Sequence, residues 1–411
     1  MSSTAINKDL SLLLKHYSAL TPSIPSFIPS PSPFPDSKTL SLPQTQQWIV
    51  RNLLPLDNPD NEEENGQEEV IVSDSSWNWK KSFWKRVVKG IEEGFELRKK
   101  EEEEGEVNVE DEEVDSEILE RMVEYLSTPS TITSTENVGG GSSGSSAGFS
   151  NRTYYWGDLN LKKQEWNSIK TREEGRMISG GTTGLRTWQA CIALGNRFLF
   201  DPSTIESFEN IIELGSGVGV LSLICAKIKQ NQIKGGKGKI IATDVDEKVL
   251  ELLKQNVKLN ESENRIKTLK LDWELAQIAS SEETCSSSEA QAELQEWELE
   301  AFGGEEEEEG DLIIGADIVY DPSLTSQLAA TISYLLSRSS ATTTTRRSNS
   351  QAIIAGTIRN ESTWESFLNQ CRCRELKIEE IELKKFKDGS GLVGAEGYEG
   401  EGVVRVVRLT L

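Results

Sequence analysis

The residues with the clearest potential for chemistry form a glycine-rich turn between a predicted strand and a predicted helix. The turn reads Glu213-Leu-Gly-Ser-Gly-Val-Gly219 and follows the apolar pair Ile211 and Ile212. Glycines let the backbone turn sharply and leave room for a ligand, and a helix N-terminus is a favourable place to bind one. Val220 replaces the last glycine of G-x-G-x-x-G and no Gly-Lys-Ser/Thr follows, so the turn is neither a dinucleotide fingerprint nor a P-loop. It predicts a nucleotide-like ligand; the alternative is a turn that only packs strand against helix.

Asp244 is a second candidate, because it ends the predicted strand 240–243. A carboxylate at the carboxyl end of this strand can accept hydrogen bonds from both hydroxyls of a ribose. The alternative role is that of N-cap for the helix predicted over 246–258, which Asp246 can fill instead. The order of strand, turn and acid favours the ligand-binding role.

Asp272-Trp273 follows the next predicted strand, 266–271. Beside a nucleotide site, an aromatic ring at a strand end can lie against one face of an adenine. The alternative is that Trp273 only covers the edge of the sheet.

The fourth predicted strand, 311–316, leads into a turn that reads Asp317-Ile-Val-Tyr320. In a doubly wound sheet, ligands bind at the carboxyl ends of the strands. This rule places Ala316, Asp317 and Tyr320 beside the same cleft as the glycine turn. The alternative is that Asp317 only caps the turn and Tyr320 only packs.

A sheet flanked by helices is needed to bring these residues together. Seven predicted strands supply it, at 211–214, 240–243, 266–271, 311–316, 351–355, 375–383 and 402–409. Helical stretches separate the first five, and we expect the last two to form an antiparallel pair. The pattern predicts an α/β fold with a seven-stranded, doubly wound (Rossmann-like) sheet, mostly parallel, preceded by a helical N-terminal module.

Composition suggests three parts along the chain. We expect a helical module over 1–127, a flexible linker rich in Ser, Thr and Gly over 128–151, and the α/β domain over 152–411. Two polar stretches, near 274–310 and 338–350, are predicted to be insertions in that domain without a chemical role.

The helical module contains an aromatic stripe at helical spacing over 76–98. Such a stripe packs into a core more often than it binds a ligand, although it can also form a face for a protein partner. We expect the module to serve substrate recognition.

Charge and residue usage exclude several classes of function. The net charge is −24, which repels nucleic-acid phosphate, so we expect no nucleic-acid partner. His16 is the only histidine and no C-x-x-C occurs among the five cysteines, so we expect no metal site and no histidine-based catalysis. No apolar run reaches membrane-spanning length and no signal-peptide pattern is present, so we expect a cytosolic location and no membrane contact. We also expect the chain to be a monomer.

Together these stretches carry a family resemblance. Glu213-Leu-Gly-Ser-Gly217, Thr243-Asp244, Asp272-Trp273 and Asp317-Ile-Val-Tyr320 resemble the motifs of seven-strand methyltransferases, in the branch of protein-lysine methyltransferases with a D-x-x-Y motif. The resemblance covers residues 152–411 and implies S-adenosylmethionine as the cofactor.

The same resemblance implies roles for individual residues. Asp317 and Tyr320 would orient the acceptor amine, and Asp244 would bind the ribose. The cofactor would also be contacted by Trp156, Glu213, Gly215, Ser216, Gly217, Asp272, Trp273 and Ala316.

A further stretch indicates the substrate. Gly181-Thr-Thr-Gly-Leu-Arg-Thr-Trp188 is similar to the subgroup that methylates a lysine of eukaryotic elongation factor 2. The alternatives are a methyltransferase that acts on another protein, a nucleic acid or a small molecule, and a non-catalytic binding protein that keeps the fold.

Overall fold

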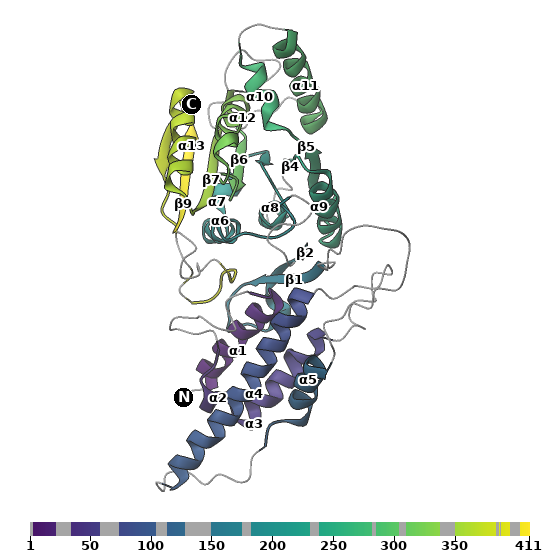
Figure 1. The fold of residues 1–411 in the computed structure, drawn as a ribbon, viewed down its shortest axis with the longest axis vertical. Helices are drawn as coiled ribbons and strands as arrows, with labels where there is room; N and C mark the ends of the chain where they lie inside the picture. The colour runs from purple at the N-terminus through teal and green to yellow at the C-terminus, as the bar shows by residue number, and fades with distance from the viewer. Residues whose placement is uncertain are drawn as a thin grey trace, which may run out of the picture. The chain divides into compact units, whose positions relative to one another are not determined.

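The computed structural model divides into two compact units, Met1–Ser168 with Glu173–Met177, and Ile169–Arg172 with Ile178–Leu411. The residues that it describes are 3–21, 34–57, 74–103, 113–127, 149–174, 182–230, 238–281, 285–303, 310–337, 350–383, 386, 388–394 and 403–411. Figure 1 shows the helices of the first unit in purple and blue and the sheet of the second in teal to yellow.

The second unit is built on a seven-stranded sheet with the order β5-β4-β3-β6-β7-β9-β8. The strands are β3 (Ile211–Glu213), β4 (Ile240–Asp244), β5 (Ile266–Lys270), β6 (Leu312–Ala316), β7 (Gln351–Ile358), β8 (Lys377–Glu380) and β9 (Val403–Thr410). Neighbouring strands from β5 to β7 are parallel, whereas β9 pairs antiparallel with both β7 and β8. The predicted fold class is therefore confirmed, including the antiparallel C-terminal pair.

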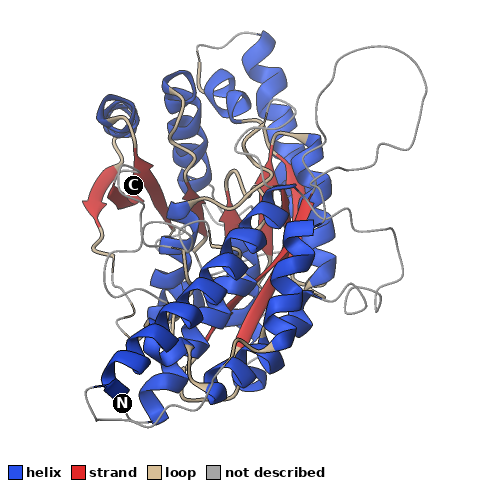
Figure 2. Ribbon diagram, turned by 60° about the horizontal axis from the view of Figure 1, so that its bottom comes forward, coloured by secondary structure: helices blue, strands red, loops and turns tan. Residues whose placement is uncertain are grey.

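Helices cover both faces of this sheet. On one face, Ile212, Ile241 and Ile313 pack into a core shared with α10 (Trp273–Ala279), α11 (Cys285–Phe302), α12 (Thr325–Ser337) and α13 (Glu361–Cys373). Figure 1 shows α6 (Gln189–Phe200), α8 (Val220–Gln230) and α9 (Glu247–Leu259) on the other side. Figure 2 shows the strands in red among these helices. Because both faces are covered, the inner strands are almost wholly apolar.

The predicted insertion at 274–310 is helical over most of its length. Two helices, α10 and α11, lie within it, and Ala276, Leu294 and Trp297 are buried in the core. The apolar residues of α11 recur three or four positions apart between acidic ones, so a single face of the helix is buried. The predicted insertion at 338–350 lies almost entirely outside the described residues.

The first unit is mainly helical. It contains α1 (Ser3–Ser18), α2 (Ser37–Leu40), α3 (Pro43–Asn52), α4 (Asp74–Glu103) and α5 (Ser116–Ser127), followed by β1 (Phe149–Trp156). β1 pairs with β2 (Asn167–Glu174) in a two-stranded sheet. The unit thus runs past the expected boundary at 127, and the end of the expected linker, 149–151, is already strand; residues 128–148 lie outside the described part.

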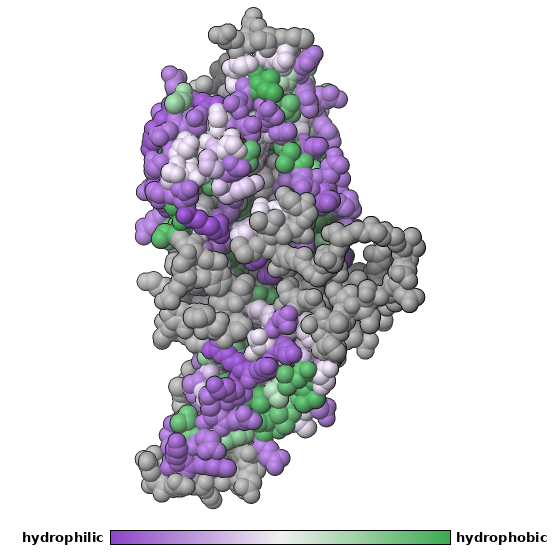
Figure 3. All heavy atoms as spheres, viewed as in Figure 1, coloured by the Kyte–Doolittle hydropathy of each residue, from purple (hydrophilic) through white to green (hydrophobic). Residues whose placement is uncertain are grey.

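The aromatic stripe of α4 forms the core of this unit. Phe83, Trp84 and Ile91 are fully buried, and Tyr17 of α1 packs on Phe83 with ring centroids 4.6 Å apart. The stripe is therefore used for packing. Figure 3 nevertheless shows hydrophobic side chains gathered on the visible surface of this unit; Leu97, Val123 and Leu126 are among its exposed large apolar residues. Across the described ranges of both units, we find no helix of the length and apolarity that a membrane span requires.

Candidate functional site

A cavity of about 480 Å³ lies at the carboxyl ends of the central strands of the second unit. It is lined by every predicted site residue except Trp156, namely Glu213, Gly215, Ser216, Gly217, Asp244, Asp272, Trp273, Ala316, Asp317 and Tyr320. These residues lie at or just after the ends of β3, β4, β5 and β6, which are adjacent and parallel in the sheet. Parallel strands bring their carboxyl ends to one edge, and this explains the convergence.

The glycine turn forms the floor of the cavity next to β3. Gly215 and Gly217 have φ values of +59° and +53°, which residues with a Cβ rarely adopt. A Cβ on Gly215 would lie 2.7 Å from Ile318 Cγ2, and one on Gly217 would lie 3.0 Å from the Gly184 carbonyl oxygen. The Ser216 N–H donates to the Thr243 carbonyl oxygen over 2.8 Å, so it is already engaged within the protein. Glycine is therefore required by both backbone conformation and space.

Glu213 is buried beneath this turn. Its carboxylate accepts hydrogen bonds from the Ser222 N–H, over 3.0 Å, and from the Ser222 hydroxyl. Because Ser222 lies in the first turn of α8, Glu213 fixes the start of that helix. Burial raises the pKa of the Glu213 carboxyl to about 7, even though the Ser222 hydrogen bonds lower it.

Asp244 lies at the end of β4, and its carboxylate holds the turn in place. Its Oδ2 accepts from the Gly217 N–H over 3.2 Å, and its Oδ1 accepts from the Asp246 N–H over 3.1 Å. Burial raises its pKa, against the effect of these hydrogen bonds. Asp246 caps α9 by accepting from the Lys248 and Val249 N–H groups, so Asp244 is not needed as the cap and remains beside the cavity.

Asp272 and Trp273 have different local roles. Asp272 is the N-cap of α10 and accepts from the Glu274 N–H over 2.9 Å. Trp273 is the first residue of α10 and lines the cavity; its Cζ2 would lie 3.6 Å from a Cβ placed on Gly215. The indole is therefore next to the glycine turn, and a flat ring system of a ligand could lie against the indole.

Asp317 is held by several hydrogen bonds. Its Oδ1 accepts from the Thr357 N–H over 2.8 Å, and its Oδ2 accepts from the Ala190 N–H over 2.8 Å and the Thr357 hydroxyl over 3.1 Å. Its own φ is +56°, which is unusual for a residue other than glycine. The carboxylate lines the cavity but is largely engaged within the protein, so its predicted contact with an amine stays a prediction.

Tyr320 is the most exposed of the predicted catalytic residues, with 57% of its surface accessible. Partial burial of its hydroxyl raises the pKa, and the nearby Asp244 and Asp321 carboxylates raise it further. The hydroxyl is therefore protonated at neutral pH, and it can donate or accept a hydrogen bond without acting as a base.

The sequence analysis missed one wall of the cavity as part of the site. Thr182, Thr183, Arg186 and Trp188, which precede α6, all line it. The Trp188 Nε1–H donates to the Thr183 carbonyl oxygen over 3.0 Å, and the Arg186 guanidinium lies 5.1 Å from the centre of the Trp188 ring. The signal in the sequence for this wall is Arg186 and Trp188, a charged and an aromatic residue close together in the stretch 181–188.

Trp156 is not among the residues that line the cavity. It ends β1 in the first unit, whereas every residue around the cavity belongs to the second. Its role in cofactor binding stays a prediction. Trp188 is also a tryptophan upstream of the glycine turn, and it does line the cavity.

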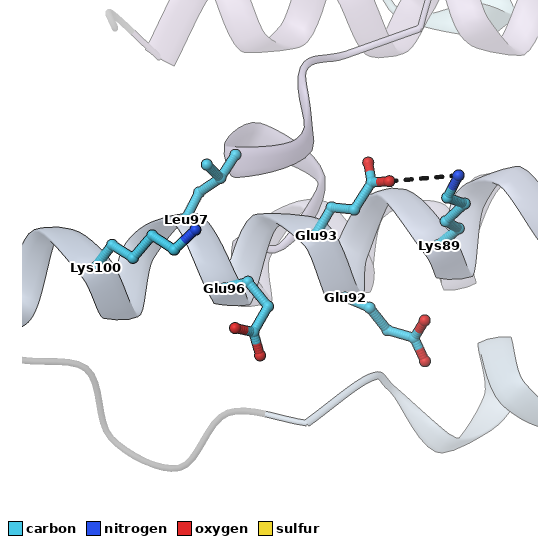
Figure 4. A pocket seen from close by; sticks show the side chains of 6 residues that line it. All are labelled: Lys89, Glu92, Glu93, Glu96, Leu97 and Lys100. Carbon is cyan, nitrogen blue, oxygen red and sulfur yellow. Dashed lines mark ion pairs between the residues drawn. The ribbon is translucent and has the colours of Figure 1, made fainter.

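A second hollow, of about 540 Å³, lies along α4 of the first unit. Figure 4 shows its six lining side chains, all from this one helix, spread around it and not converging. Lys89 and Glu93 form an i,i+4 ion pair with an Nζ–Oε1 distance of 3.5 Å. This is a solvated helix surface, and we assign no site to it.

The sheet order, the glycine turn after the central strand and the cavity over four strand ends define the class of seven-stranded Rossmann-like methyltransferases. A family model described as lysine methyltransferase matches residues 167–289. An uncharacterized protein of Dictyostelium discoideum is 30% identical over 68% of this chain and 71% of its own length. The chain belongs to the lysine methyltransferase family.

The relatives with named activities either have a lower sequence identity to this chain or align with a smaller share of it. Protein-lysine N-methyltransferase EFM3 of Chaetomium thermophilum is 31% identical over 55% of this chain and 58% of its own length. Human protein-lysine N-methyltransferase EEF2KMT is 27% identical over 49% of this chain and 54% of its own. This chain thus spans little more than half the length of these two relatives.

Proposed function

We propose that this chain transfers a methyl group from S-adenosylmethionine to a lysine side chain of a protein. The observation that carries the proposal is the single cavity in which the glycine turn, Asp244, Trp273 and the Asp317-Ile-Val-Tyr320 turn meet. The names of the relatives support a protein lysine as the acceptor.

The residues around the cavity fit such a cofactor. Gly215 and Gly217 leave open a space that a Cβ would narrow, and Asp244 offers a carboxylate to a ribose diol. Trp273 and Trp188 provide flat apolar surfaces beside the turn. When bound, the cofactor supplies an electrophilic methyl group on a positively charged sulfur.

The protein's part in the reaction is alignment and exclusion of water. Holding the amine in line with the methyl group removes much of the entropic barrier. We assign the Tyr320 hydroxyl to contact with the amine, because it lines the cavity and keeps its proton at neutral pH. The lysine must lose a proton before it attacks, and partial desolvation in the cavity lowers its pKa toward neutrality.

We further propose elongation factor 2 as the substrate. The stretch 181–188 resembles the subgroup that methylates this protein, and its residues Thr182, Arg186 and Trp188 line the cavity. The name EEF2KMT of the human and mouse relatives points the same way.

We also propose that the chain acts as a monomer in the cytosol. The free thiols of Cys225, Cys371 and Cys373 agree with a reducing compartment.

Incubation of the full chain with methyl-labelled S-adenosylmethionine and elongation factor 2, followed by peptide mass spectrometry, tests this function. We expect label on a lysine of elongation factor 2 and none after Tyr320→Ala. Label on nucleic acid or a small molecule, with none on protein, would contradict the proposal.

A further inference from the structure

Asp317 lies where three segments that are distant in sequence meet. It follows β6, its Oδ2 accepts from the Ala190 N–H at the start of α6, and both of its oxygens accept from Thr357 near the end of β7. Its own N–H donates to the Ala355 carbonyl oxygen over 2.9 Å. These contacts fix the side chain and the backbone of Asp317 together.

The contact with Ala190 caps the start of α6. The N-cap residue is Trp188, and its side chain makes no capping hydrogen bond. An indole has an N–H donor and no acceptor, so it cannot satisfy the free N–H groups of the first turn. Asp317 accepts from the second of these groups and places a negative charge at the helix N-terminus, which stabilises the helix.

A residue directly after β7 makes a separate contact with the start of α6. The Arg359 guanidinium, two residues beyond Thr357, lies 5.1 Å from the centre of the Trp188 ring. Arg186 lies at the same distance from that ring. Trp188 and Arg186 line the cavity, so the position of α6 sets the position of this wall.

We propose that Asp317 and Thr357 form a brace that positions the start of α6, and with it the Thr182–Trp188 wall of the methyl-donor cavity. Asp317 is then a positioning residue, which acts through this wall and not by contact with the amine. Thr357 is the second positioning residue; it is buried, with 7% exposure, and contributes two of the three donors. The brace itself needs no ligand, but its importance for methyl transfer rests on the proposed function.

Hydrogen exchange of the peptide that contains the Ala190 amide tests the brace without any substrate. A hydrogen bond to a charged acceptor changes an equilibrium by about tenfold or more. We expect Thr357→Val to speed this exchange about fivefold to tenfold, and Asp317→Asn to speed it more, because an amide NH₂ would face a backbone donor. Thr357→Ser keeps the hydroxyl and should restore the slow exchange.

Thr363→Val is the matched control. Thr363 is a buried threonine at the start of α13, and its hydroxyl has no hydrogen-bond partner among the described residues. The same loss of a hydroxyl there should leave both the Ala190 amide and cofactor binding as in the natural chain.

Calorimetry with S-adenosylmethionine provides the second readout. We expect the dissociation constant to rise about fivefold in Thr357→Val and more in Asp317→Asn, with Thr357→Ser close to the natural chain. Loss of methyl transfer in Asp317→Asn, with unchanged amide exchange and cofactor affinity, would overturn the brace and return Asp317 to the amine. If the natural chain binds no cofactor, the proposed function fails, while the exchange measurement still decides on the brace.

Discussion

Asp244 is the residue to which we assign recognition of the cofactor's ribose. It lies beside the cavity, and its carboxylate retains acceptor capacity after its bonds to the Gly217 and Asp246 N–H groups. Asp244→Asn replaces one oxygen by a donor, so a charge-assisted hydrogen bond to a ribose hydroxyl is lost. We expect the dissociation constant for S-adenosylmethionine to rise about tenfold to a hundredfold, measured by calorimetry.

An aspartate outside the cavity separates this effect from a general loss of charge. Asp201 is the C-cap residue of α6 and lies outside the cavity. Asp201→Asn should leave the dissociation constant unchanged. Equal affinities for the Asp244→Asn variant and the natural chain would remove Asp244 from the site.

Glu213 makes the stability of the unliganded chain depend on pH. Its pKa is about 7 in the fold, compared with 4.5 ordinarily, so the folded state holds the proton more tightly. This contribution is fully present below pH 4.5 and is lost as the pH rises through 7. Over that range it amounts to about 3 kcal/mol.

The variant Glu213→Gln keeps the shape of the side chain and cannot ionise. Denaturant unfolding at pH 5 and pH 8 should therefore show the natural chain losing stability relative to the variant as the pH rises. Parallel pH profiles for the two chains would mean that Glu213 is ionised throughout this range.

At the scale of single residues, the sequence predicted which positions meet but not how they are engaged. Glu213, Asp244 and Asp317 were found because each lies at the end of a recognisable strand. The partners of Asp317, Ala190 and Thr357, are far from it in sequence, and no local pattern indicates them. Trp188 lines the cavity although the family resemblance pointed only to Trp156, because sequence order alone does not tell which upstream tryptophan reaches the cavity.

Among the elements, the turn between β3 and α8 borders the space in which we place the cofactor. Gly215→Ala would force a Cβ to within 2.7 Å of Ile318 Cγ2 at a φ of +59°. We expect a loss of at least about 1 kcal/mol for the backbone alone, with a lower melting temperature and weaker cofactor binding.

Gly303 provides the matched control for this change. Its φ is +76°, but a Cβ there would come no closer than 3.7 Å to the Lys239 Nζ. Gly303→Ala should show the backbone cost alone, with cofactor affinity unchanged. If both variants bind the cofactor like the natural chain, the turn is not part of the site.

Helix α1 contains a buried histidine that makes the first unit sensitive to acid. Burial, together with the charge of Lys15, lowers the pKa of His16 to about 3, compared with 6.5 ordinarily. As the pH falls below 6.5, the unfolded chain takes up the proton first, so stability is lost toward pH 3. The loss is about 2 kcal/mol by pH 5.

His16→Leu removes the titrating group from this buried position. Thermal unfolding at pH 7 and pH 5 should show a smaller acid-induced drop for the variant than for the natural chain. The same drop in both would show that other groups control the acid response of this unit.

Sequence periodicity predicted the sheet more completely than the helices that cover it. All seven strands and the reversed C-terminal pair follow from apolar runs and the turns between them. The helices α10 and α11 were missed because acidic residues dominate 274–310, and the few apolar positions that bury one face of α11 do not stand out. Leu185 continues the apolar pattern of α6 toward the N-terminus, so periodicity alone does not show that the helix begins only at Gln189.

For the molecule as a whole, charge and fold fit a protein substrate. A net charge of −24 opposes binding to nucleic acid, and the amine of a lysine side chain is cationic until it loses its proton. The aromatic stripe of the helical unit is buried in the core of that unit. Any recognition of the substrate by this unit must therefore use other, exposed residues.

The most direct test of the central claim is a crystal structure of the full chain with S-adenosylhomocysteine, the product of methyl transfer. We predict one molecule in the cavity of the second unit, with its ribose hydroxyls within hydrogen-bonding distance of Asp244 and its adenine against Trp273. An empty cavity at saturating ligand, or a ligand bound elsewhere, would contradict the assignment of this cavity as the methyl-donor site.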